Sequence, residues 1–284
     1  MIVYFNGEFL SKEEVRISPD DRGFLFADGV YEVIRGYGVK PFKLEEHLKR
    51  LERSLREIQI DYPDAGKLGP IAEKLIQMNK LAGAEFTTIY IQVTRGAAPR
   101  KHTFPEEKTP PTVYMSASPG ISQKEKIERG VKIILVPDIR WYRCDIKSIS
   151  LLPNVLANQQ AKEKGAEEAV LVRDGIITEG SHTNFYAVFE GRVLTHPMNH
   201  HILPGITRDI IVNLCRDLKI PFRDELVREK DLPRAQEMFL SGTSMEVTPV
   251  VQVDDWKVGK GEPGPVTASL RAGYKKMLAD FFRS

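Results

Sequence analysis

Residues 2–10 read IVYFNGEFL and decide how the chain begins to fold. Two apolar runs flank Asn6 and Gly7, and this pair is the strongest short signal for a two-residue β-hairpin turn. The chain therefore opens in an antiparallel sheet. Residues 29–44 predict a further strand and turn, after which leucines at helical spacing predict a helix that begins at residue 44.

The remaining pattern mixes hairpins with helices. Helices are expected near 66–82, over 151–166 up to Gly165, over 206–221 up to Pro221, and over 264–282. Strands are expected within 86–96, 111–118, 131–141 and 235–253. Hairpins are expected about Asp174–Gly175 and Glu190–Gly191. Because strands come in hairpins before helices, the predicted class is α+β in two unequal domains. The expected bounds are 1–118, a polar linker over 119–128, and 129–284.

Composition limits the possible functions. The chain has 284 residues, which exceeds the usual size of one compact core. A net charge of +2, with basic and acidic residues interspersed, predicts no nucleic-acid partner. Two cysteines, Cys144 and Cys215, are too few for a disulfide framework and lack metal-ligand spacing. We expect a soluble cytoplasmic protein without a signal peptide, a membrane segment or a metal.

One lysine lies in a segment that otherwise looks ready to be buried. Residues 143–152 read RCDIKSISLL, with Lys147 between Ile146 and Ile149. Lysine is rarely fully buried unless it is paired or chemically modified. Two interpretations of Lys147 follow from this window, a surface side chain that extends its amine to water or a reactive amine.

Two turns have the composition of anion-binding sites. In residues 202–211, ILPGITRDII, a Pro-Gly pair precedes a helix whose first N–H groups, at Ile206 and Thr207, have no partner within the helix. Thr207 could instead cap that helix. In residues 239–249, FLSGTSMEVTP, hydroxyl residues surround Gly242, which suits a phosphate-binding nest or a plain turn.

Arg50 is a third candidate anion ligand, because its forked guanidinium suits bidentate oxygen recognition. It lies beside the apolar stripe of its helix, although an arginine on such a charged helix is usually solvated. No Gly-x-Gly-x-x-Gly motif or P-loop supports a nucleotide. Three anion sites and a lysine in a strand favour a phosphorylated aldehyde held as a Schiff base, and pyridoxal phosphate is the simplest candidate.

Pyridoxal phosphate needs a protein group at its ring nitrogen. Residues 177–185, ITEGSHTNF, offer Glu179 at the end of a strand, followed by Gly180, where a ring could come close. A carboxylate there keeps the ring protonated and electron-withdrawing, as transamination requires. The alternative is an exposed hairpin acid.

Several segments together resemble one enzyme family. DRGFLFADGVYEV, EHLKRL, QVTRGAAPRKHTFP, DIRWYRCDIKSISLL, ITEGSHTNF, THPMNHHILPGITRD and SGTSMEVTPV are similar, in order and spacing, to segments of the fold-type IV pyridoxal-phosphate aminotransferases. Within that family the resemblance is greatest to the bacterial enzymes that act on D-amino acids. It extends from about residue 2 to about residue 253.

The resemblance implies a role for each candidate residue. Lys147 would form the Schiff base with the cofactor and move the substrate proton, and Glu179 would pair with the pyridine nitrogen. Leu203 would pack against the ring. The phosphate cup would comprise Arg50, Ile206, Thr207, Thr243 and Ser244.

Substrate recognition would depend on three more residues. Arg100 and His102 are two apart, so in an extended stretch both side chains point the same way and could clamp one carboxylate. With the Tyr31 hydroxyl they resemble the carboxylate trap of the D-amino acid enzymes. In the family this loop reaches the active site of the neighbouring subunit, so the resemblance implies a homodimer with shared active sites.

The expected reaction is amino transfer between a D-amino acid and a 2-oxo acid, with D-alanine and 2-oxoglutarate giving pyruvate and D-glutamate. The alternatives within the family are a branched-chain L-amino acid aminotransferase, an (R)-amine transaminase and an aminodeoxychorismate lyase. The triplet Ser241-Gly242-Thr243 looks nearer to the branched-chain group. Lys147 and Glu179 are both present, which weighs against a binding module without catalysis.

Overall fold

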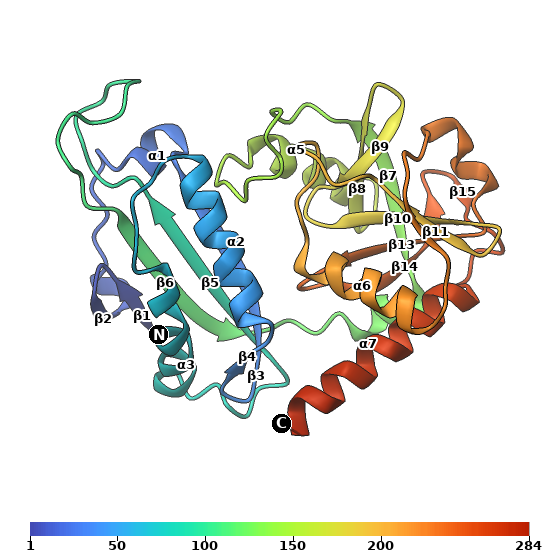
Figure 1. Cartoon of the computed structure of the whole chain (residues 1–284), viewed down its shortest axis with the longest axis horizontal. Helices are drawn as coiled ribbons and strands as arrows, with labels where there is room; N and C mark the ends of the chain where they lie inside the picture. The colour runs from blue at the N-terminus through green and yellow to red at the C-terminus, as the bar shows by residue number, and fades with distance from the viewer. Residues whose placement is uncertain (284) are drawn as a thin grey trace. The chain divides into compact units, whose positions relative to one another are not determined.

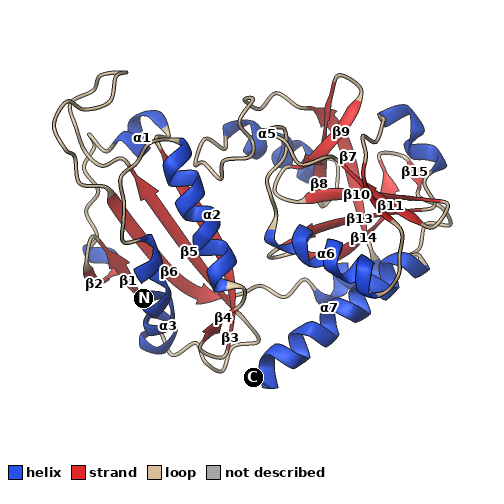
Figure 2. Ribbon diagram, viewed as in Figure 1, coloured by secondary structure: helices blue, strands red, loops and turns tan. Residues whose placement is uncertain are grey.

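The computed structural model describes residues 1–283 as two compact units (Figure 1). Unit 1 comprises Met1–Ser122 and Ile146–Ser150, and unit 2 comprises Gln123–Asp145 and the chain from Leu151 onward. The chain therefore leaves unit 2 for five residues, which include Lys147. The predicted α+β class is confirmed, since each unit combines a sheet with helices (Figure 2). The bounds predicted for domains and linker stay a prediction.

Unit 1 is a sheet with helices packed on it. Its strands are β1 (Ile2–Phe5), β2 (Glu8–Ser11), β3 (Gly29–Tyr37), β4 (Lys40–Pro41), β5 (Thr87–Thr94) and β6 (Thr112–Pro119), in the order β2-β1-β6-β5-β3-β4. Its helical segments are η1 (Lys12–Glu14), α1 (Arg22–Phe26), α2 (Leu44–Glu57), η2 (Ala65–Lys67) and α3 (Leu68–Met78). All strand pairs in this sheet are antiparallel.

The core of unit 1 lies between this sheet and helices α2 and α3, which pack on β3, β6 and β1. Alternate residues of β3, β5 and β6 face it, as the period of two in their burial shows. Ile146, from the short Ile146–Ser150 segment, belongs to the same core. That segment is therefore anchored by burial of an apolar side chain next to Lys147.

Unit 2 is built on a larger mixed sheet. Its strands are β7 (Val131–Pro137), β8 (Glu168–Arg173), β9 (Ile176–Gly180), β10 (Asn184–Phe189), β11 (Arg192–Thr195), β12 (Phe222–Asp224), β13 (Glu237–Gly242), β14 (Glu246–Val253) and β15 (Trp256–Lys257). The order is β12-β11-β10-β13-β14-β7-β8-β9, with β15 on β14. Its helices are α4 (Lys124–Arg129), α5 (Leu152–Glu163), α6 (Ile206–Asp217), η3 (Glu229–Arg234) and α7 (Pro265–Arg283).

The three predicted hairpins are confirmed. Strands β1 and β2 turn at Asn6–Gly7, β8 and β9 at Asp174–Gly175, and β10 and β11 at Glu190–Gly191, with positive φ at both residues of each turn. Positive φ at both positions gives the turn a twist that matches the flanking strands. The sequence also predicted the helices α2, α3, α5, α6 and α7 to within a few residues at each end.

Two local predictions differ from the structure. Part of the expected linker is helical, because α4 forms over Lys124–Arg129 and buries Ile127, its single apolar residue. Lys147 does not lie in a strand; the Ile146–Ser150 segment is irregular and forms one isolated bridge, between Ser148 and Val30 of β3. Among the helices of residues 1–283, none has both the length and the apolar character to cross a bilayer.

Candidate functional site

Glu179 ends strand β9 in unit 2 and is buried, so the alternative of an exposed hairpin acid is wrong. Its Oε1 accepts a 2.5 Å hydrogen bond from Arg140 Nη1, and its Oε2 accepts bonds from Asn184 Nδ2 at 3.0 Å and from the Leu203 N–H at 3.1 Å. Burial raises the pKa of the Glu179 carboxyl, and Arg140 opposes this effect. These three donors fix the carboxylate in one orientation.

Behind Glu179 lies a network of buried charges that sequence reasoning missed. Asp138, just after β7, accepts bonds from Arg140 Nε at 2.9 Å and Nη2 at 2.9 Å, and it also pairs with Arg173 Nη2 at 3.1 Å. Burial opposes ionisation of Asp138, but the two guanidinium groups keep its pKa below the usual value. Two carboxylates therefore alternate with two guanidinium groups, so that each buried charge has a partner of opposite sign.

Gly180 has close neighbours that leave no room for a side chain. A Cβ at this position would lie 2.1 Å from Thr183 Oγ1 and 2.9 Å from Glu168 Oε2. The Glu168 carboxylate is fully buried and accepts hydrogen bonds from Ser181 Oγ at 2.6 Å and Thr183 Oγ1 at 3.0 Å. Gly180 therefore leaves room for the Glu168 carboxylate, which anchors the 181–183 turn.

The start of helix α6 lies next to the Glu179 carboxylate. Asn184 links the two, since its Nδ2 donates to Glu179 and also to the Leu203 carbonyl at 3.0 Å. The N-cap is Gly205, where a Cβ would lie 2.1 Å from Asn184 Oδ1. Asn184 and Gly205 together hold the helix end close to the strand that follows Glu179.

This helix end has the features of an anion site. The N–H groups of Ile206 and Thr207 and the Thr207 hydroxyl have no hydrogen-bond partner among residues 1–283. Thr207 is buried and does not cap the helix, so the capping alternative is wrong. Unpaired N–H groups and the positive end of the helix dipole attract a negative charge.

The β13–β14 turn lies on the neighbouring strand. Ser241 pairs in register with Asn184, and its buried hydroxyl contacts the Tyr186 hydroxyl at 3.0 Å. Thr243 and Ser244 follow in the turn, where Ser244 is exposed. Unit 2 therefore carries the predicted residues Glu179, Leu203, Ile206, Thr207, Thr243 and Ser244.

Unit 1 carries the other predicted residues: Tyr31, Arg50, Arg100, His102 and Lys147. The Lys147 carbonyl accepts a 2.9 Å hydrogen bond from the Tyr31 N–H, and the Ile149 N–H donates to the Gly29 carbonyl. Lys147 Nζ lies 4.2 Å from the centroid of the Tyr31 ring. Among residues 1–283, no carboxylate forms an ion pair with this amine.

Arg50 is buried on helix α2, so it is not the solvated arginine of the alternative interpretation. Its Nε and Nη2 donate to the two oxygens of Glu32, at 2.7 and 2.8 Å. His47 contacts the same carboxylate through Nδ1 at 2.8 Å. Sequence reasoning assigned no role to Glu32 or His47.

Arg100 and His102 lie in the exposed loop between β5 and β6. Both contact the Phe26 ring, with the Arg100 guanidinium carbon 5.1 Å and the His102 ring 5.5 Å from its centroid. The base of this loop is held by Arg95, which donates to Asp28 and to two backbone carbonyls of residues 58–59. The two side chains therefore approach one ring on a loop with a fixed base.

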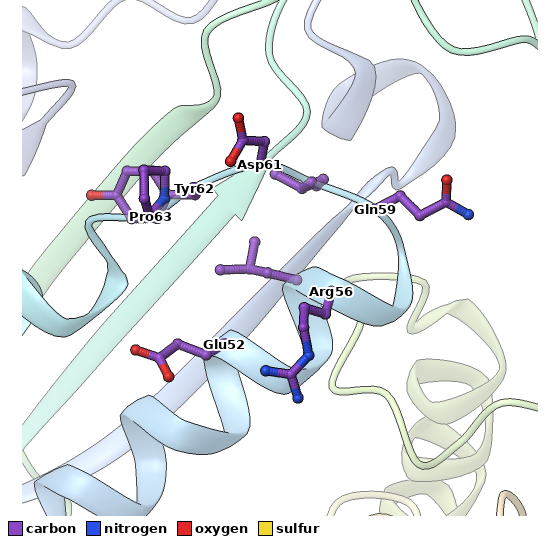
Figure 3. A pocket seen from close by; sticks show the side chains of 8 residues that line it. Glu52, Arg56, Gln59, Asp61, Tyr62 and Pro63 are labelled. Atoms are coloured by element: carbon purple, nitrogen blue, oxygen red, sulfur yellow. The ribbon is translucent and has the colours of Figure 1, made fainter.

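An open pocket lies at the end of helix α2 (Figure 3). It is lined by polar and charged side chains, among them Glu52, Arg56, Gln59, Asp61 and Tyr62. None of the residues predicted from the sequence lines it.

Comparisons with known proteins agree on one family. The family profile described as "Amino-transferase class IV" matches residues 29–253. A D-alanine aminotransferase of Staphylococcus haemolyticus is 43% identical over 280 residues, with 97% of each chain covered. Among solved structures, the branched-chain amino acid aminotransferase of Escherichia coli has a TM-score of 0.88 at 27% identity, covering 97% of this chain and 93% of that one.

A second solved structure is the branched-chain aminotransferase of the thermophilic archaeon Thermoproteus uzoniensis with norvaline. Its TM-score is 0.84 at 26% identity, and the match covers 97% of this chain and 94% of that one. The curated relative and the solved structures therefore carry names of two substrate groups within the same family.

Proposed function

Because this chain belongs to the class IV aminotransferases, we propose that it moves an amino group between D-amino acids and 2-oxo acids with pyridoxal phosphate as cofactor. The observation that carries the proposal is the buried Glu179 carboxylate, held by three donors beside a helix end that is suited to an anion. D-alanine and 2-oxoglutarate, giving pyruvate and D-glutamate, are the proposed substrates. The full-length similarity to a D-alanine aminotransferase supports this choice.

The donor set of unit 2 fits pyridoxal phosphate. A carboxylate has about four lone-pair sites, so Glu179 can accept one more hydrogen bond, from a protonated pyridine nitrogen. The Ile206 and Thr207 N–H groups and the Thr207 hydroxyl suit phosphate oxygens, and we assign Arg50, Thr243 and Ser244 to the same phosphate. Leu203, whose N–H is held by Glu179, would pack on the ring.

When bound, the cofactor withdraws electrons from the substrate Cα and so makes its proton acidic. Glu179 would hold the proton on the ring nitrogen, because a negative charge at hydrogen-bond distance favours the cationic form of the ring. With the cofactor bound, the Lys147 amine would accept the proton that leaves the substrate Cα and would serve as the proton carrier of the site. Backbone bonds at Tyr31 and Gly29 hold the Lys147 segment in place for this step.

Substrate recognition is assigned to Tyr31, Arg100 and His102. A guanidinium, an imidazole and a phenol can together hold one carboxylate, and the held carboxylate decides which face of Cα presents its hydrogen to Lys147. Binding geometry thereby selects D-amino acids.

The second candidate function is branched-chain L-amino acid aminotransferase activity, which the solved relatives and the Ser241-Gly242-Thr243 triplet favour. The first prediction distinguishes the two functions. Protein loaded with pyridoxal phosphate should lose its cofactor absorbance on addition of D-alanine, at least about 10²-fold faster than on addition of L-leucine or L-valine. Stopped-flow absorbance measures both rates. Faster reaction with L-leucine would establish the branched-chain activity, and elimination of pyruvate from aminodeoxychorismate would establish the lyase.

We also propose that the protein is a homodimer in the cytoplasm. On helix α5 the buried residues are Ala157 and Ala161, whereas Leu152, Val155 and Leu156 are exposed at 68%, 59% and 48%. An exposed apolar helix face of this kind is typical of a subunit interface. Two free, buried cysteines suit a reducing compartment.

The second prediction concerns Arg100. Arg100→Ala should raise the KM for D-alanine roughly 10- to 150-fold, because a charged hydrogen bond contributes about 1.5 to 3 kcal/mol. The neighbouring Lys101→Ala, a change of another exposed cation in the same loop, should leave the KM within about twofold. Steady-state kinetics with both variants measure this difference.

Mixing variants tests the shared active site. If Arg100 serves the neighbouring subunit, a hybrid of Arg100→Ala and Lys147→Ala chains contains one site with both native residues. Refolding the two variants together should therefore restore up to about one quarter of the native activity, since half of the dimers are hybrid and each has one working site. Absence of any recovery, with hybrid dimers demonstrated by mass, would place Arg100 and Lys147 of one chain in the same site.

A further inference from the structure

Glu32 lies on the core-facing side of strand β3, where apolar residues are expected. Val30, Glu32 and Ile34 point to the same face of the strand, and all three have no exposed surface. Helix α2 covers this face. A carboxylate in such surroundings loses the hydration that stabilises its charge, so it needs partners within the protein.

Both partners come from helix α2. Arg50 donates through Nε to Oε1 at 2.7 Å and through Nη2 to Oε2 at 2.8 Å, while His47 Nδ1 contacts Oε2 at 2.8 Å. His47 and Arg50 are three residues apart and so lie on one face of the helix. We call these three residues the β3–α2 triad.

The charges of the triad are settled by its surroundings. Burial opposes ionisation of Glu32, but Arg50 outweighs it and, together with His47, lowers the Glu32 pKa to about 2. Burial lowers the pKa of His47, and the positive charges of Arg50 and Lys147 lower it further. At neutral pH the triad therefore consists of a carboxylate, a guanidinium and a neutral imidazole whose Nδ1–H donates.

Stability alone does not explain the triad. Replacing a buried ion pair by apolar side chains of similar volume is often neutral or stabilising. What such a pair does provide is orientation. Because Glu32 holds the Nε and Nη2 edge of Arg50, the guanidinium plane is fixed and Nη1 points away from the carboxylate.

We propose that Glu32, supported by His47, is a positioning residue that presents Arg50 to the phosphate of the cofactor. The inference rests on the proposed function, in which Arg50 is a phosphate ligand. A forked guanidinium binds phosphate best when its plane and direction are fixed before the ligand arrives, because no rotamer freedom is then lost on binding. Glu32 supplies this orientation without touching the ligand.

The experiment compares two aldehydes that differ only in the phosphate. Dissociation constants of pyridoxal phosphate and of pyridoxal are measured for the purified full-length apoprotein by absorbance titration. In Glu32→Gln the affinity for pyridoxal phosphate should fall roughly tenfold to a hundredfold, the range seen when the partner behind a metal ligand is lost. The affinity for pyridoxal should stay within twofold, and the ³¹P resonance of the bound phosphate should shift.

Two further variants separate orientation from charge. Glu32→Asp keeps the charge but shortens the side chain, so it should also weaken pyridoxal phosphate selectively, and it replaces Glu32→Gln if that variant does not fold. In an Arg50→Lys background, which lacks the fork, Glu32→Gln should change the affinity less than twofold.

The outcomes are distinct. An unchanged ratio of the two affinities in Glu32→Gln and Glu32→Asp, or an equal loss for both aldehydes, overturns the role of Glu32. Even if the role of Glu32 is overturned, the proposed function stays intact when two results hold. The native protein binds pyridoxal phosphate, and Arg50→Lys selectively lowers the affinity for it. Failure of the native protein to bind pyridoxal phosphate would overturn the proposed function itself.

Discussion

Lys147→Ala protein is expected to lose transamination, with a rate at least about 10⁴-fold below that of the native protein, because it lacks both the nucleophile and the proton carrier. Treatment with borohydride should attach one phosphopyridoxyl group to the native protein and none to the variant. Intact-mass spectrometry measures the attachment, and peptide mapping locates it. Single-turnover kinetics with D-alanine give the rate.

The control for this prediction is Lys49→Ala, which removes an exposed lysine of helix α2 in the same unit. After borohydride treatment this variant should carry one phosphopyridoxyl group, as the native protein does. Its single-turnover rate with D-alanine should stay within twofold of the native rate. Attachment of the group to a lysine other than Lys147 in the native protein would contradict the assignment, whatever the activity of the variants.

Glu179→Gln is expected to lower kcat by about 10²- to 10⁴-fold, the usual contribution of a positioned proton-holding group. The amide cannot keep a pyridine nitrogen protonated, and it also introduces N–H donors next to those of Asn184 and Leu203. Glu179→Ala should in addition lower the free energy of unfolding by about 3 to 5 kcal/mol, since it leaves Arg140 with Asp138 alone. Steady-state kinetics and urea denaturation of the apoprotein measure the two effects.

Glu167→Gln provides the matched control, because Glu167 is a partly exposed acid just before β8, in the same unit, that pairs with Lys126. Its kcat and unfolding free energy should stay close to native values. A Glu179→Gln protein with kcat within threefold of native would remove Glu179 from the catalytic machinery.

Local patterns predicted the parts of the fold that depend on neighbours in sequence. The Asn-Gly and Asp-Gly turns gave the hairpins because positive φ is a property of the turn residues themselves. Helix α4 was missed because its one buried side chain, Ile127, creates no periodicity. The irregular path around Lys147 also escaped prediction, because it depends on backbone bonds to Gly29 and Tyr31, more than a hundred residues away.

The buried charges show the same limit at the candidate site. Asp138 and Arg140 look like a polar loop in the sequence. Only the fold shows that Arg140 binds Glu179 and links it to Asp138, which in turn pairs with Arg173. For Glu32 a signal was present. In GVYEVIRGY, Glu32 lies two residues from Val30 and two from Ile34, so all three point to the same face of the strand. An acid on the core-facing side could therefore have been recognised from the strand pattern.

The five-residue excursion Ile146–Ser150 has a consequence for biosynthesis. While a ribosome extends the chain beyond residue 122, the carbonyl of Gly29 and the N–H of Tyr31 on β3 still lack the donor and acceptor that residues 149 and 147 later supply. Until then the nascent sheet has an open edge, which is the usual starting point of wrong strand pairing. The bonds at residues 29–31 of β3 therefore form only after translation has continued well into unit 2, when the stretch that carries Lys147 has been made.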